Sequence, residues 1–104
     1  MFNYKTSKNL DKIISRLFKK DKKIYEQVLK KIYEICNSSN INHYKNLKHD
    51  LKEFKRVHIG QFVLVFRFSK KENLIYFTDF DHHDKIYLKR FWIIFPIKLY
   101  KIII

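Results

Sequence analysis

The fold is decided by residues 53–68, EFKRVHIGQFVLVFRF, in which β-branched and aromatic residues recur with a period of two on both sides of a single glycine. A period of two residues is typical of β-strands. It predicts one strand over Glu53–Ile59, a break at Gly60 and a second strand over Gln61–Phe68. One face of the second strand is wholly apolar and is therefore expected to lie in the core: Phe62, Leu64, Phe66 and Phe68.

A third run of strand-forming residues, Leu74–Phe80, follows the polar connection Ser69–Asn73. Three strands joined by short connections predict an antiparallel meander. The face opposite the aromatic one carries Arg67, and the register predicts that Arg56 and His58 share it. We therefore expect helices to cover one face of the sheet and leave the other partly open.

Two helices are predicted before the sheet, after a short β-like start at Phe2–Thr6. Apolar residues recur at helical spacing behind two potential N-caps, Ser7 and Asp21. The two stripes are Leu10, Ile13, Ile14, Leu17 and Phe18, and Ile24, Val28, Ile32 and Ile35. The sequence thus predicts an α+β domain of β-α-α-β-β-β order, with a small antiparallel sheet packed on a helical hairpin.

The composition describes one small basic domain. The chain has 104 residues, 46% of them hydrophobic, and 23 Lys and Arg against 10 Asp and Glu give a net charge of +13. Such an excess points to polyanionic partners. A single cysteine, Cys36, excludes an intrachain disulfide and indicates a reducing compartment. With no secretory signal in Met1–Asn9, we expect a cytoplasmic protein.

The last residues, 91–104, form an apolar extension of unknown role beyond the predicted domain at 1–90. A membrane-spanning helix needs about 20 apolar residues. This segment is shorter and contains Lys98 and Lys101, so no membrane association is expected. We expect the extension to pack on the domain or on a partner protein.

Histidines dominate the candidate chemistry. They fall in three places: Lys48-His49-Asp50, Arg56-Val57-His58 and residues 79–87. Because a meander returns the chain on itself, four of the five histidines could converge. Two imidazoles beside a phosphodiester can remove a proton from a ribose 2′-hydroxyl and return one to the leaving oxygen. Arg56 or Arg67 would stabilise the charge on the phosphate.

Each candidate also has a simpler interpretation. His49 and His58 could be exposed surface residues, and Tyr87 could pack rather than stack on a base. His82, His83 and Asp84 invite a zinc interpretation, but neighbouring strand residues point apart and no cysteine is near, so we predict neither a metal nor another cofactor.

Three segments of the chain resemble a known family. Leu51–Gly60, Phe62–Arg67 and His82–Tyr87, preceded by the helical hairpin, are similar to the RelE/ParE superfamily of toxin–antitoxin toxins, and the similarity covers roughly Met1 to Tyr87. The resemblance implies a compact ribonuclease that cuts messenger RNA, usually in the ribosomal A site. It also implies an antitoxin partner, which the charge of this chain predicts to be acidic.

The resemblance transfers the active residues unevenly. Where RelE-like members have two arginines, this chain has Val63 and His83. The histidine-dependent YafQ-like branch matches at His49, His58 and His83, although Gln61 stands where that branch has an aspartate. Gln61 cannot accept a proton at neutral pH.

Our hypothesis is metal-independent cleavage of messenger RNA. His83 would act as acid, His58 or His49 as base, Arg56 would stabilise charge and Tyr87 would orient the nucleotide. The backbone of the RNA would be held by Lys48, Lys52, Arg67 and Lys85. Two alternatives stay open: a ParE-like inhibitor of DNA gyrase, and an RNA- or ribosome-binding module without catalysis.

Overall fold

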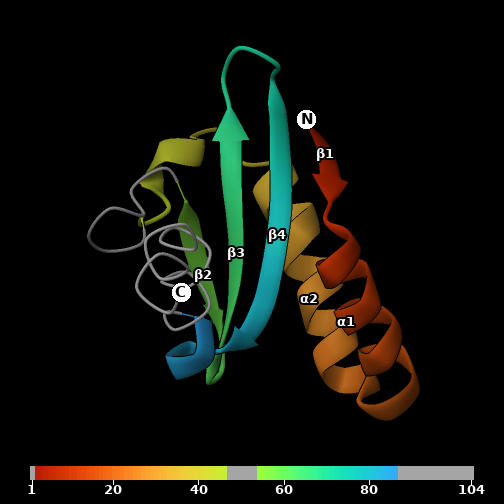
Figure 1. The fold of residues 1–104 in the computed structure, drawn as a ribbon. Coiled ribbons are helices and arrows are strands. Elements are labelled where there is room, and N and C mark those ends of the chain that lie inside the picture. The colour runs from red at the N-terminus through yellow and green to blue at the C-terminus, as the bar shows by residue number, and fades with distance from the viewer. Residues whose placement is uncertain (1, 47–53, 87–104) are drawn as a thin grey trace, which may run out of the picture.

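The computed structural model describes residues 2–46 and 54–86. Figure 1 shows a four-stranded sheet with two helices packed against it. Its elements, in chain order, are β1 (Asn3–Thr6), α1 (Lys8–Lys20), α2 (Lys22–Cys36), the short 3-10 helix η1 (Ile41–His43), β2 (Lys55–Ile59), β3 (Phe62–Ser69) and β4 (Leu74–His82). The predicted α+β class and element order are confirmed.

The sheet is mixed, so the prediction of a wholly antiparallel sheet is wrong for one pair. The strand order is β1-β4-β3-β2. The β2–β3 and β3–β4 pairs are antiparallel, as predicted, whereas β1 runs parallel to β4. The reason is the crossover: the chain leaves β1, passes through both helices over one face, and returns at the opposite edge in β2 (Figure 1).

Both predicted helix caps are present. The Ser7 hydroxyl accepts from the amide of Leu10 at 3.0 Å, and the Asp21 carboxylate accepts from the amide of Ile24 at 3.2 Å. These bonds satisfy amides that a helix start leaves without partners. Phe18 departs from the predicted buried stripe, since it is 49% exposed near the end of α1 and packs edge-on against Tyr25.

The main core lies between the helices and the predicted aromatic face. It joins Leu10 of α1 and Val28, Ile32 and Ile35 of α2 to Leu64, Phe66, Ile75, Phe77 and Phe80 of the sheet. An irregular step in the β3–β4 pairing places Val65 opposite Asp79 and Phe66 opposite Phe77, leaving Thr78 as the extra residue. This bulge shifts by one residue the alternation of side chains along β4, so that Phe77 and Phe80, three positions apart, both face the core.

The second face of the sheet is less open than predicted. Val63 and Val65 are fully buried there, in a small cluster with Ile86 and the partly buried Phe54. Residues 83–86 form a helical turn after β4, and this turn carries Ile86 back over the sheet. The turn therefore covers part of the second face and fixes the position of the other residues in the turn.

Neither long helix of the described chain is extended and apolar enough to cross a bilayer. The predicted domain boundary at residue 90 and the apolar segment 91–104 lie outside the described residues.

Candidate functional site

Two distant parts of the chain bring His58 and His83 together at one end of the sheet. His58 lies in β2, and His83 follows β4 directly. The backbone amide of His83 donates to the carbonyl of Gln61, in the turn between β2 and β3, at 3.1 Å. As a result the two imidazole rings stack, with centroids 5.7 Å apart and an interplanar angle of 27°. The predicted convergence is thus present for these two residues.

Arg56 completes this group from the same strand. Its Nη1 lies 2.6 Å from Nε2 of His58. A guanidinium can only donate, so Nε2 of His58 accepts and the proton of the neutral ring is on Nδ1. Nε of Arg56 is buried and has no hydrogen-bond partner within the described residues. A buried donor without an acceptor costs about 1–3 kcal/mol, so an incoming anion would improve the environment of this guanidinium.

The surroundings of His58 favour its neutral form. Partial burial lowers the pKa of the His58 imidazole, and the nearby positive charges of Arg56, His83 and Lys45 lower it further. Since the ordinary pKa of histidine is about 6.5, His58 is neutral at physiological pH and can accept a proton.

His83 is exposed, as His58 is. Its side chain is 47% exposed, and its Nδ1 lies 3.4 Å from the Asp84 carboxylate. Ile86, three residues further along the same turn, is fully buried against Val63 and Val65. An exposed imidazole is therefore held on a turn that is anchored by a buried side chain.

The neighbouring His82 makes a different ring contact, although its Nδ1 accepts from the amide of Asp84, the residue beside His83, at 3.4 Å. Its ring meets the edge of Phe62 at 6.1 Å, whereas His83 meets His58. Within residues 2–46 and 54–86, no three His, Cys, Asp or Glu side chains gather as a metal-binding group.

Of the other predicted site residues, the structure describes Arg67 and Lys85. Arg67 stacks on the ring of Tyr76, 4.1 Å from its centroid. Arg67 lies four positions beyond Val63, the residue of β3 that pairs with His58, and is therefore about 13 Å further along the strand. Lys85 is exposed on the turn that carries His83. Lys48, His49, Lys52 and Tyr87 lie outside the described residues.

Lys45 is a neighbour that local patterning did not reveal. Its effect on His58 arises because residues 45–46 run beside β2: Asn46 bridges Lys55, and the amide of Arg56 donates to the Lys45 carbonyl at 2.9 Å. A lysine in a polar loop gives no local signal of such pairing.

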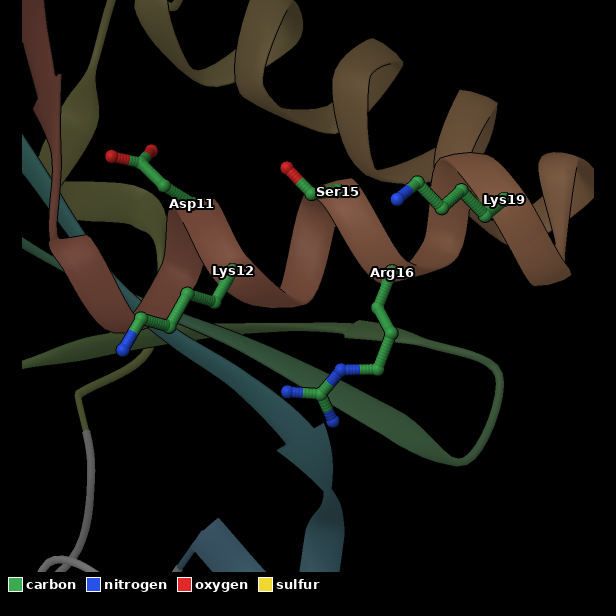
Figure 2. A pocket seen from close by; sticks show the side chains of 5 residues that line it. All are labelled: Asp11, Lys12, Ser15, Arg16 and Lys19. Atoms are coloured by element: carbon green, nitrogen blue, oxygen red, sulfur yellow. The ribbon is translucent and has the colours of Figure 1, made fainter.

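A second basic surface lies on α1. Figure 2 shows a shallow depression lined by Asp11, Lys12, Ser15, Arg16 and Lys19, with the Lys12 and Arg16 side chains on one side of the helix. Arg16 also lines a hollow beside Phe62 and Asp81. None of the predicted site residues that the structure describes lines the α1 depression. Its lysines therefore serve as control positions, because replacing one of them removes the same charge as replacing a lysine of the site.

Comparison with known sequences identifies the family. Residues 2–87 match the model of the ParE toxin of type II toxin–antitoxin systems. A curated protein of Methanocaldococcus jannaschii named "Putative toxin RelE4" is 48% identical over 91 residues, which cover 86% of this chain and 95% of that protein. An uncharacterized protein of Methanosarcina mazei is 43% identical over 88 residues, 84% of this chain and its own full length.

Solved structures agree on the fold. The isolated RelE toxin of Escherichia coli superimposes with a TM-score of 0.60 at 14% identity, covering 90% of this chain and 99% of that one. The RelBE2 toxin–antitoxin complex of Mycobacterium tuberculosis contains a chain with a TM-score of 0.53 at 13% identity, covering 79% and 98%. With the family match over most of its length, the chain belongs to the ParE toxin family of the RelE/ParE superfamily and is the toxin component of a toxin–antitoxin module.

Proposed function

We propose that this toxin is an endoribonuclease that cleaves messenger RNA on the ribosome with His58 and His83 as its base and acid. The observation that carries the proposal is the stacked pair of imidazoles, 5.7 Å apart, with Arg56 bound to one of them. A neutral imidazole, an exposed imidazole and a guanidinium are the groups needed to cleave RNA through its own 2′-hydroxyl.

The reaction is a transfer of the phosphorus from one oxygen to another. His58 removes the proton from the ribose 2′-hydroxyl as that oxygen bonds to phosphorus. The bond from phosphorus to the 5′-oxygen breaks, and His83 donates a proton to that oxygen. The products are a 2′,3′-cyclic phosphate and a 5′-hydroxyl. Both proton transfers use side chains, so the step as written needs no metal ion.

Arg56 has two tasks in this scheme. In the free protein its Nη1 occupies the Nε2 lone pair of His58, the position that must accept the proton. A bound phosphate attracts the guanidinium, since charge-assisted bonds to phosphate are stronger than a bond to a neutral imidazole. Substrate binding thereby frees the base and places a positive charge on the phosphate oxygens.

The other predicted RNA contacts extend this proposal. Lys85, which is exposed on the turn that carries His83, would meet the leaving nucleotide. Arg67, about 13 Å along β3, would contact the strand further away. Lys48 and Lys52 would hold the RNA backbone and Tyr87 would orient the nucleotide, as expected from the sequence, and His49 is the alternative base.

Replacing the acid tests the function. His83→Ala should lower cleavage of messenger RNA on programmed ribosomes by about 10²- to 10⁴-fold. His82→Ala is the matched control, because it removes the adjacent imidazole, which contacts Phe62 instead. Mapping the RNA ends should give cyclic phosphates. A folded His83→Ala protein that cleaves as fast as wild type would refute the assignment.

We also propose an acidic antitoxin as the partner. Beside the edge strand β1 lies a hollow of about 460 Å³, with Tyr4, Ile14, Leu29 and Tyr33 on its walls. Tyr4, Leu29 and Tyr33 are 49%, 41% and 65% exposed, and because they surround one hollow they form an exposed apolar patch of the kind that marks protein–protein contacts. The RelBE2 structure, a toxin–antitoxin complex, supports a partner of this kind. Tyr33→Asp should weaken copurification with the acidic protein encoded beside the toxin.

Inhibition of DNA gyrase is a second candidate, favoured by the match to the ParE model. It predicts that purified toxin blocks supercoiling and that His83→Ala blocks it equally well. Cleavage of RNA without any effect on supercoiling would exclude this alternative.

A further inference from the structure

A hollow of about 320 Å³ is lined by His58 together with residues of α2. It lies between α2 and the end of β2, so two elements far apart in sequence form its walls. Its volume is at the lower end of the range for small-molecule sites, enough for one nucleotide unit. Its polar lining consists of Gln27, Lys30, Lys31, Glu34 and His58, with Gly60 at the turn.

The charge of the hollow is positive. Lys31 forms an ion pair with Glu34 at 2.9 Å, so these two charges largely offset each other. Lys30 has no ion pair or hydrogen bond within the described part of the chain, and its ammonium group is therefore available to an anion. Lysine binds phosphate as a compact point charge with three donors.

The edge of β2 adds a backbone donor. The strand order makes β2 an edge strand. The amide of Arg56 points away from β3, because it donates to the Lys45 carbonyl. Amides two residues apart in a strand point the same way, so the amide of His58 also faces the outer edge, where the hollow lies. Gln27 supplies a further donor from α2.

We propose that this hollow binds the sugar–phosphate backbone of the RNA at the nucleotide next to the scissile bond. The inference rests on the proposed ribonuclease function. His58 belongs both to the catalytic group and to the wall of the hollow, so a strand cleaved beside His58 continues into it. Lys30 and the His58 amide bind the phosphate, and the Gln27 side chain meets the ribose or base.

The test measures binding separately from cleavage. The probe is a short oligoribonucleotide with a 2′-deoxy sugar at the cleavage position, which cannot react. Lys30→Gln should reduce the slope of log affinity against log salt by about 0.7, the value for one phosphate contact to a single strand. Lys19→Gln on α1 is the matched control, with the same loss of charge at a residue that lines a different depression, and should leave the slope unchanged.

Two further variants should not weaken RNA binding as Lys30→Gln does. Lys30→Arg should retain binding, and Glu34→Gln should increase it by releasing Lys31 and removing a negative charge. In cleavage assays Lys30→Gln should raise KM and leave kcat nearly unchanged, as loss of uniform binding does.

The outcomes separate this inference from the proposed function. Equal affinity and slope for Lys30→Gln and Lys19→Gln would overturn the binding site, even if wild-type protein cleaves RNA. A specific loss in Lys30→Gln supports the site, and it does so even if the wild-type protein fails to cleave, a result that would refute only the ribonuclease proposal.

Discussion

Replacement of Ile86 by alanine tests how the fold positions His83. Ile86 is fully buried against Val63 and Val65, and His83 lies on the same helical turn. Truncating a buried isoleucine to alanine costs about 2–5 kcal/mol. Phe54 is only partly buried and can move into the space, so we expect a cost of about 2–3 kcal/mol. At about 4–8 °C per kcal/mol, the midpoint of thermal unfolding should fall by roughly 8–24 °C.

The matched control is Ile75→Ala. Ile75 is equally buried, but it lies in the core beneath the helices. Both variants lose stability, yet only Ile86→Ala releases the turn that carries His83. Well below both unfolding midpoints, Ile86→Ala should lose about 10²-fold in cleavage, the effect of a misplaced catalytic group, and Ile75→Ala only a little.

A second measurement does not depend on activity. His83 is one of the charges that lower the pKa of His58, so displacement of His83 should raise that pKa in an NMR titration. If Ile86→Ala and Ile75→Ala behave alike in both cleavage and His58 titration, then the buried turn does not position His83 and the reasoning fails.

Three other predictions follow from single contacts. Because burial and Arg56 lower the pKa of His58, the acidic limb of the pH profile of cleavage should lie below about pH 6.5. Arg56→Gln should move this limb to higher pH. If the limb does not move, Arg56 does not influence the base. Ser7→Ala loses the cap bond to the Leu10 amide and the bond to the Thr78 carbonyl, and should lower the free energy of unfolding by about 0.5–2 kcal/mol in urea. Burial raises the pKa of the Cys36 thiol, so iodoacetamide should modify Cys36 at the rate of unfolding, and rapid labelling of the native protein would contradict its placement.

The helices and the three-stranded meander could be predicted because their signals are local. Ser7 and Asp21 lie directly before apolar stripes of helical period, and the segments on either side of Gly60 are rich in β-branched and aromatic residues whose side chains alternate between two faces. Gly60 has a φ of 62°, a conformation that glycine adopts without strain. The buried face of Leu64 and Phe66 follows from the same alternation.

The candidate site was predictable only in part. Histidine and arginine at Arg56, His58 and His83 indicated proton transfer beside an anion, and the meander indicated that they could meet. The contact of Arg56 with Nε2 of His58, the approach of Lys45 and the hollow beside Lys30 depend on pairing and packing between segments. The residue types indicate the chemistry, but they do not determine the distances between these groups.

By itself the sequence determined the two long helices, the strands and the core face of β3, and it indicated the kind of chemistry, because period, capping and side-chain type are properties of neighbouring residues. The tertiary structure alone decided that β1 pairs with β4 in parallel, that Thr78 shifts the phase of β4, and that Ile86 closes the second face. Each of these is a choice between competing long-range contacts, and its free energy depends on which surfaces the whole chain can bury at once.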